Sequence, residues 1–208
     1  MGLRDENKAE RRDRIVKAAA ALFRKRGYEA VKISAIAAAA KVSVGTIYNY
    51  YQNKGDLLVA IVALEVNEVL AAGAKIVQRP PRTARRAVDA LMGTYVGHSL
   101  VYLSKEMWRQ AMAISTQQPE SPAGREYAAL DAALTAQSRA LMRKLQDLGE
   151  LPAQADAARL GEIVFNNTNM MFILFIKNGA MAEAELRRAL RRQNAALLAC
   201  AAGAGGRA

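Results

Sequence analysis

The sequence predicts an all-helical protein. Apolar residues recur at intervals of three and four along most of the 208 residues, as they do on one face of an α-helix. No segment of convincing length alternates between apolar and polar residues, which is the pattern of a half-buried strand. Glycine and proline residues divide the chain into segments that suit about nine helices. We therefore expect a three-helix amino-terminal headpiece followed by a helical body.

The first predicted helix runs from residue 11 to residue 26. Its apolar stripe consists of Ile15, Ala18, Ala19, Leu22 and Phe23. Gly27 ends it, and a second helix begins near Ile33. Residues 1–10 are highly charged and lack apolar spacing, so we expect a frayed lead-in there.

A short helix with an unusual outer face is predicted after the second one. Residues 34–58 read SAIAAAAKVSVGTIYNYYQNKGDLL. Ser43 can accept a hydrogen bond from the free amides of the turn that follows it, so a helix begins at Val44. Ile47 and Tyr51 lie four residues apart, and Val44 lies three before Ile47, so these three share a face that packs on the preceding helix. The remaining positions then project outward: Gly45, Thr46, Tyr48, Asn49 and Tyr50. Such a pair of short helices fits a helix-turn-helix whose second helix enters a major groove.

Six longer helices are expected in the rest of the chain. Pro80 and Pro81 end the first of them, because proline removes amide donors and restricts the preceding residue. Ser121 and Pro122 open another in the positions of a cap and a first helical residue. The expected ranges are 56–78, 83–103, 104–116, 122–148, 155–177 and 182–202. The tail, residues 202–208, is expected to be disordered.

The charge of the chain favours a polyanionic partner. The formal net charge is +11, and residues 1–55 contain 12 basic and 5 acidic side chains, so the front of the chain is the most basic part. Nucleic acid and an acidic membrane surface both fit this balance. The single cysteine excludes an internal disulfide framework and fits a reducing compartment. No secretory pattern opens the chain, and the apolar run at residues 170–176 is far shorter than the ~20 residues of a membrane helix. We expect a cytoplasmic protein without a membrane partner.

Residues 11–58 resemble the DNA-binding end of the tetracycline-repressor (TetR) family. The likeness is carried by the motif VSVGTIYNYYQNK at residues 42–54 and by the helix that precedes it. The resemblance implies a DNA-binding domain at residues 1–55 and a ligand-binding and dimerisation domain at residues 56–208. It also implies a homodimer that lays the third helix of each headpiece in a major groove of an operator and pairs through its last two helices.

The resemblance also implies which residues meet DNA. Tyr48 would reach a phosphate and Lys54 would clamp the backbone, while Ile47 and Tyr51 would be core. The chain departs from the family pattern at Lys41, where a glycine is usual because a side chain in this left-handed turn residue is strained, and at Lys32, where a threonine commonly caps the second helix. Both lysines add positive charge beside the expected DNA. The full set of expected contacts is Lys32, Ser34, Ser43, Val44, Gly45, Thr46, Tyr48, Asn49, Tyr50 and Lys54.

A ligand pocket and a dimer interface are expected in the body. A few polar side chains among apolar and methionine residues suit a pocket for a small apolar or aromatic effector, although core packing is the alternative for each. The expected pocket residues are Met92, Tyr95, His98, Tyr102, Trp108, Met112, Asn166 and Met170. Asn167 lies on an apolar stripe, so its amide needs a partner, for which a ligand, its twin in a dimer and another helix are the candidates. The expected interface residues are Asn167, Met171, Leu174, Leu186, Leu190 and Leu197.

These features favour a ligand-responsive DNA-binding regulator, most often a repressor in such families. The alternative is an architectural protein that binds DNA nonspecifically, or a membrane surface, through charge alone. An enzyme is disfavoured because the one histidine and the one cysteine lie about a hundred residues apart, without metal-ligand spacing or a glycine-rich phosphate loop. We expect no metal and no cofactor. The expected partners are an operator in double-stranded DNA, a small-molecule effector and a second copy of the chain.

Overall fold

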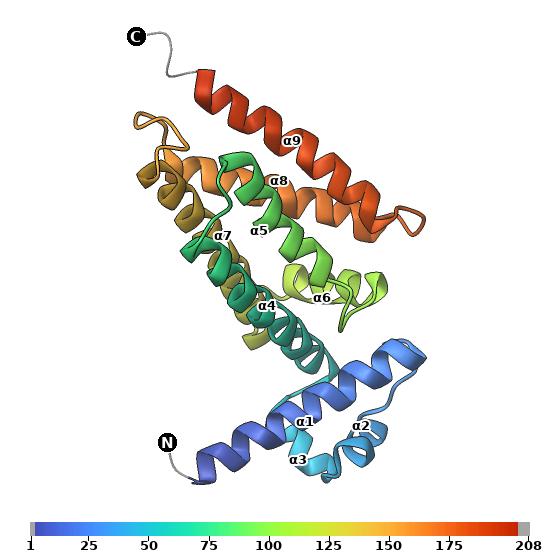
Figure 1. The fold of residues 1–208 in the computed structure, drawn as a ribbon. Helices are drawn as coiled ribbons and strands as arrows, with labels where there is room; N and C mark the ends of the chain where they lie inside the picture. The colour runs from blue at the N-terminus through green and yellow to red at the C-terminus, as the bar shows by residue number, and fades with distance from the viewer. Residues whose placement is uncertain (1–2, 204–208) are drawn as a thin grey trace. The chain divides into compact units, whose positions relative to one another are not determined.

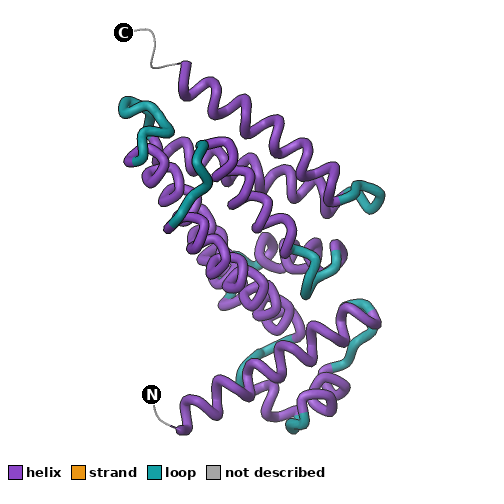
Figure 2. The backbone as a smooth tube through the Cα atoms, viewed as in Figure 1, coloured by secondary structure: helices purple, strands orange, loops and turns teal. Residues whose placement is uncertain are grey.

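The computed structural model describes residues 3–203, which are helical over most of that range (Figures 1 and 2). Within this range no strand occurs and the helices are α1 (Leu3–Arg26), α2 (Ile33–Ala40), α3 (Val44–Tyr48), α4 (Lys54–Gln78), α5 (Ala84–His98), α6 (Lys105–Gln117), α7 (Pro122–Asp147), α8 (Ala157–Lys177) and α9 (Glu183–Gly203). The predicted all-helical class with about nine helices is confirmed. The predicted disordered tail begins inside α9, and its residues 204–208 lie outside the described part of the chain.

Helix α1 begins earlier than predicted. Residues 3–10 are helical rather than a frayed lead-in. Asp5 and Glu6 lie in the first turn and basic residues lie in the last, which stabilises both ends of the helix dipole. Asp13 also pairs with Lys17 one turn later, with 2.8 Å between Oδ2 and Nζ. The acidic first turn therefore favours helix in residues 3–10, ahead of the apolar stripe.

Helix α5 ends earlier than predicted, at His98 instead of residue 103. The Ser99 hydroxyl donates to the carbonyl of Val96 at 2.7 Å and draws the chain into a turn. Beyond it, the amide of Tyr102 donates to Oε2 of Glu65 at 3.2 Å instead of to a helical carbonyl. The carboxylate of this buried glutamate therefore holds the segment between α5 and α6 out of helical geometry.

The chain divides into two compact units. The first consists of residues 1–65 and 100–128, and the second of residues 66–99 and 129–208. The first unit holds α1, α2, α3, α6 and the opening parts of α4 and α7. These units do not coincide with the two domains predicted from the sequence, residues 1–55 and residues 56–208. The boundary between those domains stays a prediction.

The core of the second unit is built around α5. This helix packs along α9 and also against α8, and its Val88, Leu91 and Met92 lie in an apolar cluster with residues of α4, α7, α8 and α9. Two side-chain hydrogen bonds in series connect helices of this unit. The Tyr95 hydroxyl donates to Oε1 of Gln137 at 2.8 Å, and Nε2 of Gln137 donates to the carbonyl of Leu70 at 2.8 Å. These bonds fix α5, α7 and α4 relative to one another.

Helix α4 is the one described helix that is long and apolar enough to cross a membrane. This helix, rather than residues 170–176, therefore contains the longest strongly apolar segment. Within its most apolar stretch, 61% is buried inside the fold, as is usual for a core helix.

Candidate nucleic-acid interface

The turn between α2 and α3 is shaped by a lysine in a glycine-like conformation. Lys41 has φ 55° and ψ 48°. Its amide donates to the carbonyl of Ala38 at 3.2 Å, and the amide of Val42 donates to the carbonyl of Ala37 at 3.0 Å. This pair of bonds is a Schellman motif, which satisfies the last carbonyls of a helix through a left-handed residue. The expected left-handed residue at Lys41 is confirmed, and the side chain of this lysine is exposed beside the start of α3.

Ser43 caps α3 as predicted. The amide of Thr46 donates to Oγ of Ser43 at 3.0 Å, and the two hydroxyl oxygens lie 2.8 Å apart. The helix begins at Val44. Because the Thr46 hydroxyl is tied to the cap, its position relative to the helix axis is fixed by a local contact.

The inner and outer faces of α3 separate clearly. Ile47 is 1% exposed and Tyr51 is 5% exposed, whereas Tyr48 is 52% exposed. The Tyr51 hydroxyl accepts from Nε of Arg12 in α1 at 3.3 Å, and burial raises the pKa of this tyrosine. The expected outward positions are all at least partly exposed: Gly45, Thr46, Tyr48, Asn49 and Tyr50.

Val44 departs from the predicted arrangement. Helical spacing placed it on the inner face with Ile47, whereas the family resemblance placed it among the DNA contacts, and it is 39% exposed. Ile47 is the one buried residue within the five residues of α3, and the first residue of so short a helix remains on its exposed rim. Val44 is therefore on the side that also presents Tyr48.

Lys54 is held by the protein itself. Its Nζ donates to the carbonyls of Tyr28 at 2.9 Å and of Glu29 at 3.1 Å, and lies 4.4 Å from the centre of the Tyr28 ring. The Glu29 carboxylate is 3.7 Å away, and the lysine side chain is only 24% exposed. These contacts fasten the loop between α1 and α2 to the first turn of α4. The phosphate contact expected of Lys54 stays a prediction, and it requires this ammonium to share or release those partners.

Two further expected DNA contacts lie at the start of α2. Lys32 occupies the capping position with no side-chain capping bond, and Ser34 lies in the first turn. Both side chains are exposed. Lys41 was noted in the sequence for its departure from the family pattern, and its exposure adds it to the candidate contacts.

The residues expected to form the ligand pocket are divided between the two units. Trp108 is buried, and Tyr102 and Met112 are half-buried, in the first unit. In the second unit, Met92 is buried in the core and the Tyr95 hydroxyl is bonded to Gln137.

The other three expected pocket residues of the second unit lie at its surface. Nε2 of the half-buried His98 lies 3.3 Å from Oε2 of Glu68. Asn166 and Met170 are exposed, the latter by 56%, on the side of α8 that turns away from the core. Their expected role in ligand binding stays a prediction, and α8 buries the stripe that includes Leu160 and Val164.

The expected dimer residues also lie on different faces. Leu186 is fully buried and Leu190 is 4% exposed inside the single chain, so neither offers a surface to a second copy. Leu174 is 49% exposed, while Met171 and Leu197 are half-buried.

Asn167 finds its partner within the chain. Its Nδ2 donates to Oδ1 of Asn194 in α9 at 3.1 Å. Of the three candidates, another helix supplies the bond.

An apolar groove runs between α8 and α9. Its lining consists of Ile163, Asn166, Asn167, Gln193, Ala196 and Leu197. Ile163, Met170 and Leu174 are exposed on α8 to between 42% and 56%. Among the described residues, no group of three or more histidine, cysteine, aspartate or glutamate side chains is placed to hold a metal ion.

Comparison with known proteins identifies the headpiece. Residues 15–61 match the family model described as bacterial regulatory proteins, tetR family. The HTH-type transcriptional repressor KstR of Rhodococcus jostii (strain RHA1) is 47% identical over 64 residues, which are 31% of this chain and 30% of that protein. The matches to the curated relatives thus span about a third of their length or less.

Comparison with solved structures extends the likeness to the whole fold. A TetR-family transcriptional regulator from Streptomyces coelicolor has a TM-score of 0.67 and 17% identity, covering 93% of this chain and 97% of that one. FadR of Thermus thermophilus, described as a TetR-family transcriptional repressor in complex with lauroyl-CoA, has a TM-score of 0.61 and 22% identity, covering 90% and 93%. From these matches we conclude that residues 15–61 form a headpiece of the tetR family of bacterial regulatory proteins, and that the chain shares the all-helical fold of the solved TetR-family structures.

Proposed function

We propose that the protein is a dimeric, ligand-responsive DNA-binding transcriptional regulator, a repressor that leaves its operator when a small effector binds. The observation that carries this proposal is the exposed polar face of α3, a capped helix within the segment that matches the family model. Helix α3 buries only Ile47 and exposes Tyr48 and Asn49, so packing within the subunit does not account for its outer face.

The outer face of α3 has the chemistry of a groove-reading surface. The side chains of Thr46 and Asn49 can exchange hydrogen bonds with base edges, and exposed Val44 can meet a thymine methyl group. Tyr48 can donate to a phosphate. The exposed Lys32 and Lys41 lie at the two ends of α2 and supply positive charge for the DNA backbone.

The groove between α8 and α9 supports pairing of two copies. Three apolar side chains of α8, Ile163, Met170 and Leu174, are left exposed to a large extent. Exposed apolar patches mark protein–protein contacts, and Ile163 lines the groove itself. We therefore assign the interface to this face, with Asn167 and Leu197 lining the groove, and leave the buried Leu186 and Leu190 to the core.

The effector proposed is a small apolar or aromatic molecule that binds in the body. The complex of the related fold with lauroyl-CoA supports an effector with an apolar part. Binding would favour a separation of the two headpieces unlike the ~34–36 Å between consecutive major grooves, and the mismatch would release DNA.

Titration against DNA tests the DNA-binding part of the proposal. The full-length protein is titrated with an operator duplex and with a random duplex at several salt concentrations. Tyr48→Phe and Lys54→Ala are expected to weaken binding to both duplexes, whereas Thr46→Ala is expected also to change sequence preference. Arg192→Gln, an exposed change on α9, is the control and should leave both affinities nearly unchanged.

Equal affinity of the wild type and the three α3 and α4 variants would contradict the assignment of the interface. Equal affinity for the two duplexes would favour the alternative of charge-driven, nonspecific binding. Because Lys54 also holds the α1–α2 loop, its variant is compared only after thermal unfolding shows that the headpiece remains folded.

A distance measurement tests the release mechanism. Gln52→Cys places a spin label on an exposed site beside α3, in a background where Cys200 is replaced by serine. Pulsed electron resonance on the dimer should report a changed label-to-label distance when lauroyl-CoA is added. An unchanged distance at saturating ligand contradicts release by altered headpiece spacing.

A further inference from the structure

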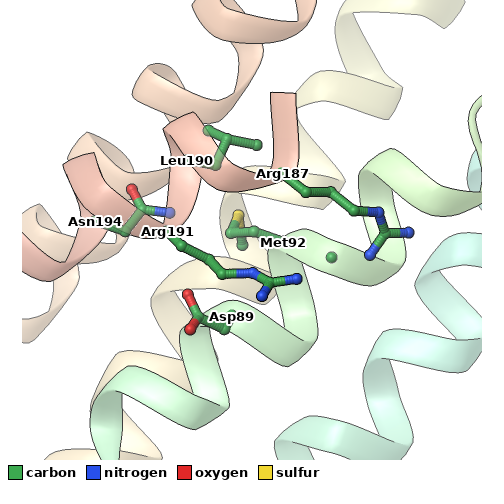
Figure 3. Close-up of a pocket in the computed structure, with 7 residues that line it drawn as sticks. Asp89, Met92, Arg187, Leu190, Arg191 and Asn194 are labelled. Atoms are coloured by element: carbon green, nitrogen blue, oxygen red, sulfur yellow. The ribbon is translucent and has the colours of Figure 1, made fainter. Parts of the chain in front are cut away.

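A small cleft lies between α5 and α9, within the second unit. Figure 3 shows the side chains around it. Its lining residues are Asp89, Met92, Gly93, Arg187, Leu190, Arg191 and Asn194. Its volume is about 20 Å³, which holds a group the size of one water molecule.

One wall of the cleft contains a buried donor that lacks a protein partner. Asn194 is 2% exposed, and its Oδ1 accepts from Asn167. Among the described residues, Nδ2 of Asn194 has no hydrogen-bond partner. In Figure 3 this nitrogen points toward Met92, into the cleft. A buried amide donor is normally satisfied, so this site calls for an acceptor atom from outside the protein.

Two guanidinium groups reach across the same cleft. Nε of Arg187 donates to Oε1 of Glu183 at 2.7 Å, which directs the rest of the guanidinium over α5. There it lies against Gly93, where an added Cβ would be 3.1 Å from Nη1. Arg191 extends above Asp89 in Figure 3. Burial raises the pKa of Asp89, while the charges of Arg191 and Arg85 act against that rise.

A wider groove continues from the cleft along α5. The two share Asp89, Gly93 and Arg187, and the groove has a volume of about 420 Å³. Its other lining residues are Ala90, Thr94, Gly97 and His98, of which the histidine faces Glu68. This volume is within the range of small-molecule sites, and the floor of small side chains leaves room for the body of a ligand.

The geometry points to the α5–α9 cleft as a binding site for a small organic carboxylate. One carboxylate oxygen enters the inner cleft and accepts from Nδ2 of Asn194. The other oxygen accepts a charge-assisted bond from the guanidinium of Arg191, because Arg187 is already bonded to Glu183. The body of the molecule lies in the adjoining groove. A single water molecule would also satisfy Asn194, but it would not use the positive charge of Arg191 at the mouth of the cleft.

This site is joined to the proposed dimer face by one hydrogen bond. Asn194 accepts from Asn167, which lines the groove between α8 and α9. A ligand that binds to Asn194 is therefore expected to perturb the side-chain amide of Asn167 as well. The binding site itself does not depend on the proposed DNA-binding function, since no residue of α1, α2 or α3 takes part.

Nuclear magnetic resonance on full-length protein labelled with ¹⁵N-asparagine tests the site. Sodium acetate probes the inner cleft alone, and sodium benzoate probes the cleft and the groove, with benzamide as the uncharged control. Saturable shifts of the Asn194 and Asn167 side-chain amides are expected with both carboxylates, with the stronger affinity for benzoate.

Variants identify the groups that bind. Arg191→Gln is expected to weaken benzoate binding about tenfold, the loss of one charge-assisted bond. Asn194→Asp keeps an acceptor for Asn167 but replaces the donor with a carboxylate, so it should abolish binding. Arg192→Gln is the matched control, because this exposed arginine of α9 lies outside the cleft and should bind benzoate as the wild type does. If Asn194→Asp fails to fold, the exposed Arg191→Gln still decides the outcome.

Any of four results overturns the proposal. The first is that the amide shifts do not saturate with acetate or benzoate up to about 10 mM, and the second is that Arg191→Gln binds benzoate with wild-type affinity. The third is that the shifts saturate with inorganic phosphate but not with carboxylates. The fourth is a crystal structure grown with benzoate that shows only water against Asn194. If the carboxylate site is refuted, the result of the DNA titration still stands, so the two proposals are judged separately.

Discussion

Replacing Lys41 with glycine separates the cost of its backbone conformation from the value of its charge. With φ 55° and ψ 48°, Lys41 lies at the centre of the left-handed region, so it carries the full strain of that conformation. That strain is about 1–2 kcal/mol for a residue with a Cβ, and glycine gives back about 0.5–1 kcal/mol through the greater entropy of the unfolded chain. Lys41→Gly is therefore expected to stabilise the protein by about 0.5–1 kcal/mol. For a chain of this size the midpoint of thermal unfolding should rise by about 1–4 °C.

The same substitution is expected to weaken DNA binding. The Lys41 side chain is exposed between α2 and α3, where it can neutralise one phosphate. Losing one phosphate contact should reduce the slope of log affinity against log salt concentration by about 0.9. Stability and DNA affinity should thus change in opposite directions.

Lys41→Ala is the matched control, because it removes the charge but keeps a Cβ in the left-handed residue. It should lower the salt slope as much as the glycine variant does while leaving the unfolding midpoint close to that of the wild type. Circular dichroism melts and fluorescence anisotropy with labelled operator provide the two measurements. Equal midpoints for the glycine and alanine variants refute the strain argument, and an unchanged salt slope in both refutes the phosphate contact.

Three further predictions follow from local contacts and burial. Ser43→Ala removes the cap of α3 and should cost about 1 kcal/mol in urea unfolding, and an unchanged midpoint would show that the cap contributes nothing. Burial raises the pKa of Asp131 to about 6, so the folded protein retains this proton where the unfolded chain has lost it, and stability should fall as pH rises from about 4 to about 6. Asp131→Asn should then be more stable than the wild type above pH 6, by up to about 3 kcal/mol, and equally stable near pH 3. A variant that is less stable than the wild type at pH 7 contradicts this reasoning. Leu174→Glu should yield folded monomers in sedimentation experiments, because Leu174 is exposed on the proposed interface. Leu186→Ala should lower the free energy of unfolding by about 2–5 kcal/mol and leave the dimer intact, because Leu186 is buried in the core. A dimeric Leu174→Glu variant together with a monomeric Leu186→Ala variant would place the interface elsewhere.

The features that depend on neighbouring residues were predictable from the sequence. Ser43 as a cap, Lys41 as a left-handed residue and the end of α4 before Pro80 were all expected and observed. Caps and turns are decided within a few residues, so a local pattern contains the information. The inward side of α3 was predicted for the same reason, except at Val44, where the shortness of the helix left the residue exposed.

The sequence by itself determined the all-helical class, the capped helix of the headpiece and the basic character of its surroundings. Only the tertiary structure decided which faces of the later helices are covered. Helix α8 has apolar residues on two sides, and periodicity cannot tell that Val164 is core while Met170 is exposed. The same holds for Lys54, which the fold ties to carbonyls 25 and 26 residues earlier, and for the bond between Asn167 and Asn194. A helical repeat fixes the spacing of side chains on one helix, but a contact between distant segments exists only once another element has packed against it.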